Sequence, residues 1–308
     1  MIEVIPLKYG TMFKQVFSQP DVFNQFAKDI LGIDLNVSRV HTEYEYPEPV
    51  GFVRSRYDLF AEDVERRVIV EIQHVKEEDF FDRFLYYHLI SLVEQVRGAD
   101  EYGFGRTVYT IVVLTSVPRD GSINFSCAIS DMSPVDEWGK KVPVYPHRLV
   151  FLSPRQVNEK TPPTVRKWLD FIKDSLDGIV EESHYGEILF QQMIEEIRKQ
   201  TIDPSLLSEI KDEAAWEKAK ARFEREGREE GWKAGRKEGR EEGREEGLEK
   251  GLKKGLEKGL EKGQKEGILS QKRQTVITAK QMGMEVAAIA TLLELAEIEV
   301  KEILNQEA

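Results

Sequence analysis

Residues 56–74 decide the fold, and they read Arg56-Tyr-Asp-Leu-Phe-Ala-Glu-Asp-Val-Glu-Arg-Arg-Val-Ile-Val-Glu-Ile-Gln-His74. Polar and apolar residues alternate on both sides of Val64 and Glu65, and a period of two is typical of paired β-strands. This pattern predicts a hairpin with Val64 and Glu65 at its turn. In that hairpin, Asp58 lies directly opposite Glu71.

The same alternation predicts which side chains share a face of the hairpin. Gln73 lies opposite Arg56, on the face that also carries Asp58 and Glu71. The other face carries the apolar residues expected in the core, namely Tyr57, Leu59, Val70 and Ile72.

Two carboxylates that face each other across strands repel by up to about 1 kcal/mol. A hard divalent cation reverses the sign of this interaction, because Mg²⁺ binds through one or two carboxylates together with phosphate oxygens of a substrate. The geometry therefore leaves two interpretations open. Asp58 and Glu71 either hold Mg²⁺ for attack of water on a phosphodiester, or they are solvated strand charges beside which Gln73 has no role.

Helix and strand patterns alternate around the hairpin. Helical spacing of apolar residues predicts a helix over 10–31, broken near Pro20 and ended by Gly32, and another over 79–97. Strand patterns cover residues 37–46, 54–64, 67–74, 107–115 and 122–129. We place 122–129 beside the buried strand 107–115 and predict an edge strand over 144–152. This order predicts an α/β domain over 1–157, with a central mixed sheet flanked by helices.

The C-terminal half is predicted to be all helical. It divides into a helical region (158–226), a charged Gly-x-x-x repeat (227–267) and a small helical module (268–308) whose turns fall at Gly283 and 294–297. Glutamates outnumber lysines and arginines in the last module, which favours a protein contact over a DNA-recognition helix.

The repeat contains eleven of the 22 glycines, at every fourth residue from Gly227 to Gly267. Eleven glycines disfavour an isolated helix by about 10 kcal/mol relative to alanine. Two interpretations remain. Glycines four residues apart allow close packing of helices, or the segment is a polar tether. We favour the packed helix, and therefore a homo-oligomer formed through the C-terminal helices.

Composition limits the classes of function. The 308 residues include 44 basic and 56 acidic side chains, a net charge of −12, so a generally basic nucleic-acid-binding surface is excluded and any DNA contact must be local. No stretch is long and apolar enough for a membrane span. One cysteine, Cys127, excludes an internal disulfide and a cysteine-based zinc site. A cytoplasmic protein without a membrane partner is the expected class.

The hairpin resembles the signature of PD-(D/E)XK nucleases in its D…ExQ form. Segments 8–17, 58–63, 69–74, 82–88 and 110–115 resemble, in this order, the Rpn family of recombination-promoting nucleases, whose members are also labelled transposases. The resemblance covers residues 7 to about 157. It implies a restriction-endonuclease-like core and Mg²⁺-dependent cleavage of DNA. Asp58 and Glu71 match the metal-binding carboxylates, and Gln73 matches the position of the catalytic lysine.

The chain departs from the family pattern at two positions. Gln73 cannot act as a base or carry the charge of a lysine, so it could only orient water or phosphate. Gly10 stands where many members have an acidic residue, so a role for that acid is expected to be absent. Arg56, and secondarily Lys14, are our candidates for the missing positive charge.

Further basic and aromatic residues are candidates for DNA contact. Arg83 and Tyr87 are four residues apart on the helix after the motif and therefore share a face. They either contact phosphate or form a helix surface with Tyr87 half-buried. His74 and His88 are interpreted as histidines satisfied beside the core rather than metal ligands.

These observations predict a Mg²⁺-dependent DNA endonuclease that promotes recombination or mobile-element processes and oligomerises through its glycine repeat. A second hypothesis is a nuclease-fold protein that binds DNA or a partner without cutting, because the lysine has become Gln73. A third is an assembly protein in which the repeat is the functional part.

Overall fold

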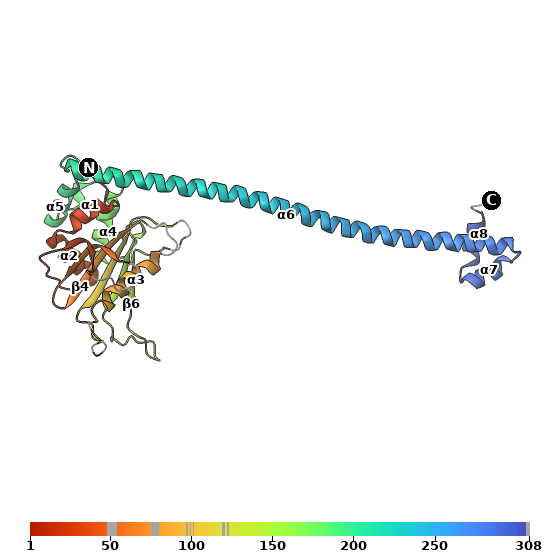
Figure 1. The fold of residues 1–308 in the computed structure, drawn as a ribbon, viewed down its shortest axis with the longest axis horizontal. Coiled ribbons are helices and arrows are strands. Elements are labelled where there is room, and N and C mark those ends of the chain that lie inside the picture. Colours follow the sequence, from red (N-terminus) through yellow and green to blue (C-terminus); the bar gives the residue numbers. More distant parts are fainter. Residues whose placement is uncertain are drawn as a thin grey trace. The chain divides into compact units, whose positions relative to one another are not determined.

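The computed structural model describes residues 1–47, 54–74, 80–96, 98, 100, 102–118, 121 and 123–305. The chain forms two compact units, Met1–Ala219 and Lys220–Ala308. The first is an α/β unit built around a mixed sheet, and the second is helical (Figure 1). The α/β class and the long helical C-terminal half are therefore confirmed.

A six-stranded mixed sheet forms the centre of the first unit, in the order β2-β3-β4-β5-β7-β6. Strands β4, β5 and β7 run parallel, whereas β2, β3 and β6 are each antiparallel to their neighbours. The strands are β2 (His41–Glu45), β3 (Arg56–Glu62), β4 (Arg66–Gln73), β5 (Thr107–Leu114), β6 (Cys127–Asp131) and β7 (Arg148–Leu152). Two short strands, β1 (Ile2–Glu3) and β8 (Ile179–Val180), pair separately.

The β3–β4 hairpin has the predicted turn and, from Leu59 to Glu62, the predicted register. Leu59 pairs with Val70, and three further pairs follow toward the turn. The Asp63 carboxylate closes the turn by accepting hydrogen bonds from the N–H groups of Glu65 (2.8 Å) and Arg66 (2.6 Å). A local pattern of alternation and one turn residue were therefore sufficient to set this pairing.

The order of the last two strands differs from the sequence prediction. The segment that contains β7 was predicted to be an edge strand, but β7 lies between β5 and β6. Residues 149–152 are all buried, and only an interior strand can cover apolar side chains on both faces. The edge strand is β6, in which Ile129 is 55% exposed.

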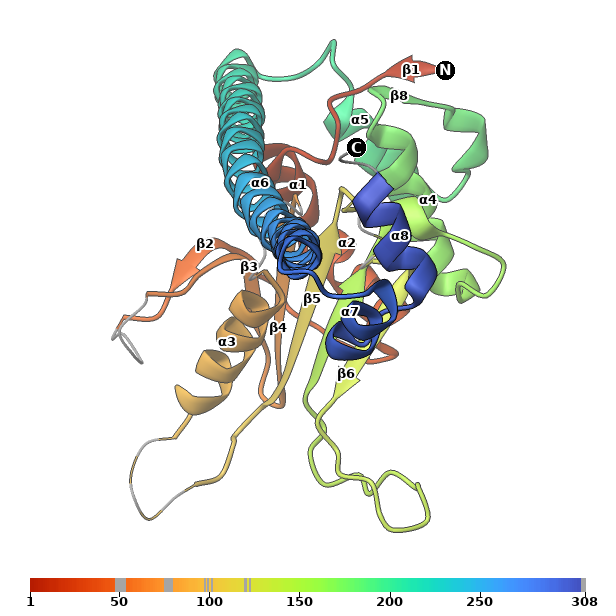
Figure 2. The ribbon, with the colours of Figure 1, turned by 90° about the vertical axis from the view of Figure 1, so that its right-hand side faces the viewer.

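Helices cover the two faces of the sheet unequally (Figure 2). One face is packed against α1 (Gly10–Phe17), α2 (Pro20–Leu31), α4 (Pro163–Ser175) and α5 (Ile188–Ile197). On the other face, α3 (Phe80–Val93) is the one α-helix of the described residues that contributes to the core. Short 3₁₀ helices occur at Pro154–Gln156 and Glu182–His184.

The core of the first unit extends beyond the predicted boundary at residue 157. Trp168 of α4 is fully buried, and its indole N–H donates to the Asp29 carboxylate of α2 at 2.8 Å. Ile210, in the first turns of α6 (Pro204–Gln281), belongs to the same cluster. Because α4, α5 and the start of α6 bury their apolar faces in this core, the compact unit continues to Ala219.

The second unit contains the remainder of α6 and two short helices, α7 (Val286–Leu293) and α8 (Glu297–Asn305). The predicted turns are present, with left-handed φ angles at Gly283 (87°) and Glu294 (51°). A small core, formed by Val276, Ala279, Ile289, Ala290 and Val300, holds the end of α6 against α7 and α8. The whole Gly-x-x-x repeat is α-helical within α6, as predicted.

Candidate functional site

At Asp58 and Glu71, side-chain carboxylates take part in the hydrogen bonding between β3 and β4. The Asp58 N–H donates to Glu71 Oε1 (3.2 Å), and the Ile72 N–H donates to Asp58 Oδ2 (2.9 Å). Each carboxylate thus accepts a hydrogen bond from the backbone of the opposite strand. The two acidic side chains are thereby fixed between the strands and held close together.

The alternation of faces breaks at this point of β3. Leu59 packs with Val70 in the core under α1 and α2, as predicted. Tyr57 was predicted to share that face, but it packs in the cluster under α3, and its hydroxyl donates to the Tyr87 carbonyl at 3.1 Å. An irregularity at Asp58, which lies between Tyr57 and Leu59, turns Tyr57 to the other side of the sheet.

A third acid, Glu43, lies opposite Asp58 on the other neighbouring strand. Thr42 pairs with Leu59 and Tyr44 with Tyr57, which places Glu43 between these pairs. Its φ of 52° is left-handed, a conformation that non-glycine residues rarely adopt and that is enriched at functional sites. The sequence around Glu43 alternates like an ordinary strand, so it contains no signal for this distortion.

Burial makes both hairpin carboxylates difficult to ionise, and a neighbouring acid adds to the effect on each, Asp58 for Glu71 and Glu43 for Asp58. Glu71 is 5% exposed, and burial, followed by the charge of Asp58, raises the pKa of Glu71 well above its usual range. Burial also raises the pKa of Asp58, while the Ile72 N–H and the cations of Lys14 and Arg83 oppose this shift. Binding of a proton or of a cation at this pair is therefore favoured, because either one reduces the negative charge.

Arg83 of α3 brings a positive charge to Gln73. Its guanidinium donates a hydrogen bond to the Gln73 side-chain oxygen, and the Gln73 amide donates to the His74 carbonyl at 2.9 Å. The Arg83 charge also opposes the rise in the pKa of both Asp58 and Glu71. Arg83 was predicted as a DNA contact, and its hydrogen bond to Gln73 also links it directly to a residue of the site.

The two residues proposed to replace the lysine are both paired with acids of β2. Lys14 of α1 forms an ion pair with Glu43. Arg56 donates to Glu45 at 2.7 Å and lies 3.8 Å from Glu43, with its side chain 63% exposed. The described partners of Arg56 are therefore on β2, whereas the extended hairpin register would have placed it at Gln73.

Tyr87 and the histidines lie at the border between site and core. Tyr87 is half-buried, and burial, followed by the charge of Glu71, raises the pKa of its hydroxyl. His88 is fully buried, its Nδ1 lies 2.8 Å from the Thr110 hydroxyl, and burial lowers its pKa to about 4. His74 Nδ1 lies 2.9 Å from the Thr115 hydroxyl. His88 is therefore part of the core, and His74 is half-buried.

A distant glutamate caps the helix that carries Lys14. Glu213 of α6 accepts hydrogen bonds from the N–H groups of Gly10 (2.6 Å) and Thr11 (3.3 Å) at the start of α1. Tyr9, the N-cap residue, makes no side-chain capping bond. Gly10 has no carboxylate of its own, and the carboxylate that reaches this helix end comes from a residue far along the chain. No local pattern distinguishes Glu213 from its helical neighbours.

The acidic pair has the donor chemistry that suits Mg²⁺. Within the described residues, no group of three or more His, Cys, Asp or Glu side chains is arranged to hold a metal ion. Mg²⁺ does not need such a cage, because it retains several waters and takes one or two carboxylates plus substrate phosphate. Asp58 and Glu71 can supply these two carboxylates.

Comparisons with protein-family models, curated proteins and solved structures returned no match to this chain. In the part of the chain that the structure describes, no helix combines the length and the apolar character needed to cross a membrane. Any statement about activity therefore depends on the residues of the site and on the sequence resemblance.

The carboxylate pair leads to a prediction for Glu71→Gln. The amide oxygen can still accept the bond from the Asp58 N–H, while loss of the charge removes the repulsion, so the free energy of unfolding should rise by up to about 1 kcal/mol at pH 8 without divalent cations. Because a raised carboxyl pKa means that the folded state binds the proton more tightly, the difference from wild type should shrink as the pH falls through that raised pKa.

Urea unfolding at several pH values measures this difference. Glu65→Gln, in the turn of the same hairpin with its side chain 75% exposed, is the control and should change stability by less than about 0.5 kcal/mol. A less stable Glu71→Gln protein at pH 8 would contradict the repulsion.

The cap at α1 leads to a prediction for Glu213→Ala. Loss of a capping carboxylate should lower the free energy of unfolding by about 1 kcal/mol, because two N–H groups at the start of α1 lose their acceptor. Glu209→Ala removes an exposed carboxylate one turn earlier in α6 and should leave stability nearly unchanged. Equal effects of the two substitutions in urea unfolding would show that the capping bonds contribute nothing.

Proposed function

We propose that the protein is a Mg²⁺-dependent DNA endonuclease with a restriction-endonuclease-like core. The observation that carries the proposal is the pair of Asp58 and Glu71, each bonded to the backbone of the other's strand and each with a raised pKa. Carboxylates whose pKa values are raised by burial and by neighbouring acids are characteristic of functional sites. The resemblance to the Rpn family supplies the substrate class, DNA, and a role in recombination or mobile-element processes.

Each residue of the site has a separate role in this proposal. Asp58 and Glu71 would hold Mg²⁺, which when bound would supply Lewis acidity and lower the pKa of a bound water. Gln73 can orient water or a phosphate oxygen through its amide, but it cannot remove a proton. Arg83, bonded to Gln73, places a positive charge where negative charge develops on the phosphodiester. Lys14 and the exposed Arg56 are the DNA-contact candidates on the side of β2, and Tyr87 on the side of α3.

A second candidate function is binding of DNA without cleavage. It is favoured by the engagement of Gln73 at both ends of its amide, by Arg83 and by the His74 carbonyl. A glutamine held in this way could position phosphate without activating water. Measurements of cleavage and binding with the same protein separate the two functions.

Plasmid nicking tests the nuclease directly. The wild-type protein should nick supercoiled DNA with Mg²⁺ and not with EDTA, and Asp58→Ala should reduce nicking at least a hundredfold, because one of two metal ligands is lost. Glu65→Ala, in the turn of the same hairpin with its side chain 75% exposed, is the matched control and should retain activity. Nicking that survives Asp58→Ala would overturn the proposed site. Mg²⁺-dependent DNA binding without nicking would favour the second function.

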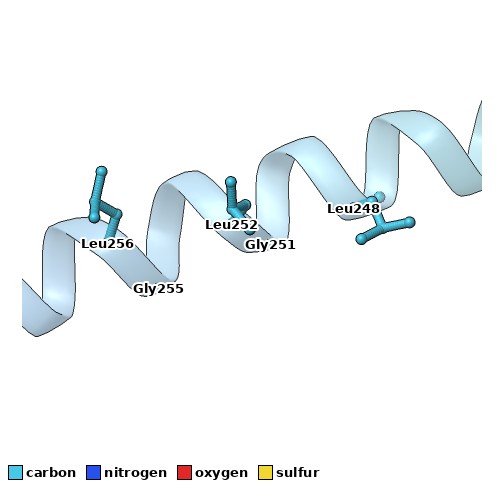
Figure 3. Close-up of a pocket in the computed structure, with 6 residues that line it drawn as sticks. Leu248, Gly251, Leu252, Gly255 and Leu256 are labelled. Atoms are coloured by element: carbon cyan, nitrogen blue, oxygen red, sulfur yellow. The ribbon is translucent and has the colours of Figure 1, made fainter.

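We further propose that the chain self-associates through the repeat of α6. A Cβ built on any of its eleven glycines would meet no neighbouring group within 4 Å in the described part of the chain. Beside these glycines, Leu248, Leu252 and Leu256 line an apolar groove (Figure 3) and are 64–74% exposed. A smooth glycine surface with adjacent leucines allows a second helix backbone to approach closely.

The energetics of the helix support the same proposal. Its glycines oppose helix formation by about 10 kcal/mol in total. The i, i+4 ion pairs of the repeat, such as Glu246–Lys250 and Glu261–Lys265, are exposed, and pairs of this kind contribute only a few tenths of a kcal/mol each. Packing against another helix supplies the stabilisation of α6 that these local ion pairs do not.

The glycine contact can be tested without shortening the chain. Gly251→Leu combined with Gly255→Leu should convert an oligomer into a lower-mass species, because the new side chains obstruct close packing while they favour the helix itself. Lys250→Leu combined with Lys254→Leu adds the same side chains one position away and should retain the oligomer. Light scattering measures both masses; a wild-type monomer, or an unchanged mass of the glycine variant, would contradict self-association through the glycines.

A further inference from the structure

Helix α3 is apolar on both of its sides. Its inner side packs on the sheet through residues that include Phe80, Phe84 and Leu92. Five of its positions are exposed, and one of them is Asp82. The other four carry large apolar side chains, namely Phe81 (37% exposed), Leu85 (40%), Leu89 (42%) and Val93 (51%). A row of large apolar side chains on a helix surface is normally covered, so this side of α3 requires a partner.

The four exposed side chains form one continuous ridge. They are spaced by four residues, and side chains at this spacing form the i±4n rows that pack into the grooves of another helix. Two ridges of this class cross at about −50°, which is the commonest packing angle in globular proteins. Helices that cross at this angle touch over few turns, so the 14 residues of α3 can supply the whole contact.

We propose that a second copy of this chain covers α3, with the two α3 helices packed about a twofold axis beside Leu85 and Leu89. The ridge is self-complementary under this symmetry, because Leu85 of one copy meets Leu89 of the other. The exposed charge of α3 is also compatible, since Asp82 lies near one end of the helix and the two Asp82 side chains fall at opposite ends of the contact.

The chemistry of the ridge disfavours other occupants. DNA contacts depend on cations and hydrogen-bond donors, and the four ridge side chains have neither. A strongly charged protein would lose solvation without gaining a counter-charge, apart from the single carboxylate of Asp82. An apolar helix with the same four-residue spacing is the complement that remains, and α3 of another copy has this spacing.

The size of the ridge determines the expected strength of the dimer. Four side chains at 37–51% exposure present an apolar patch of roughly 300 Å², a size that is often functional on monomers. Stable interfaces bury about 800 Å² on each partner. The α3 contact is therefore weak and depends on protein concentration, unless another contact holds the copies together. Arg83, which donates a hydrogen bond to Gln73, also lies on α3, so the dimer would form next to the candidate site.

Cysteine cross-linking in the full-length chain tests this contact. Cys127 is the one cysteine of the sequence, so Cys127→Ser combined with Leu89→Cys leaves a single thiol. A short bis-maleimide should then convert the protein into a covalent dimer, with a yield that rises with protein concentration. Cys127→Ser combined with Ile188→Cys, a thiol on α5 at a position 79% exposed, is the matched control and should give at least tenfold less dimer.

Opposite charges at Leu85 test the twofold symmetry. Added to the Leu89→Cys protein, Leu85→Lys or Leu85→Glu alone should each reduce cross-linking at least tenfold, because two like charges then lie close together on either side of the axis. An equal mixture of the two should restore at least half of it. Equal cross-linking of Leu89→Cys and Ile188→Cys, or a mixture that stays as low as its components, would overturn the proposal.

Two checks make the result unambiguous. Circular dichroism melting of each variant should match that of the Cys127→Ser parent, because the further substituted side chains, Leu85, Leu89 and Ile188, are exposed in the single chain. Cross-linking requires no cleavage of DNA, so an α3 dimer can be found or excluded whether or not the protein proves to be a nuclease.

Discussion

The site depends on one electrostatic constraint: two carboxylates, Asp58 and Glu71, are held together where water cannot fully solvate them. Such a pair is unfavourable in isolation, because burial and like charge both disfavour ionisation. The surrounding structure partly offsets this with N–H groups from each strand and with cations from two helices, Lys14 of α1 and Arg83 of α3. The remaining strain lies where a bound cation would relieve it, and stored strain of this kind is typical of functional sites.

Much of the fold could be predicted from the sequence because its determinants are local. The hairpin register followed from alternation and a turn that Asp63 closes with its own side chain. Helix ends followed from single residues, such as Gly32 with its left-handed φ of 69°. The order of β7 and β6 could not be obtained in this way, because strand order depends on which segment can bury both faces, and that depends on the complete sheet.

The candidate site was predictable for the residues in its motif and not for those that support them. Asp58, Glu71 and Gln73 follow from spacing within a single hairpin. Glu43 and Glu213 come from other elements, and each lies in a sequence context that looks ordinary. The left-handed φ of Glu43 and the capping bonds of Glu213 result from tertiary contacts, which override local propensity. For the same reason, Arg83 was identified as a surface candidate while its bond to Gln73 was not foreseen.

The part of the chain that resembles a nuclease is shorter than the part that folds as a unit. The resemblance ends near residue 157, yet Trp168 and Ile210 are buried in the same core as the sheet, and Glu213 completes the first helix. A fragment that ended at 157 would expose the apolar surface that α4 and α5 cover and would open the N-terminus of α1. Lys14, whose cation lowers the pKa of Asp58, lies on α1, so the carboxylate pair depends on residues beyond its own motif. The smallest physical unit that contains the site therefore includes the beginning of α6.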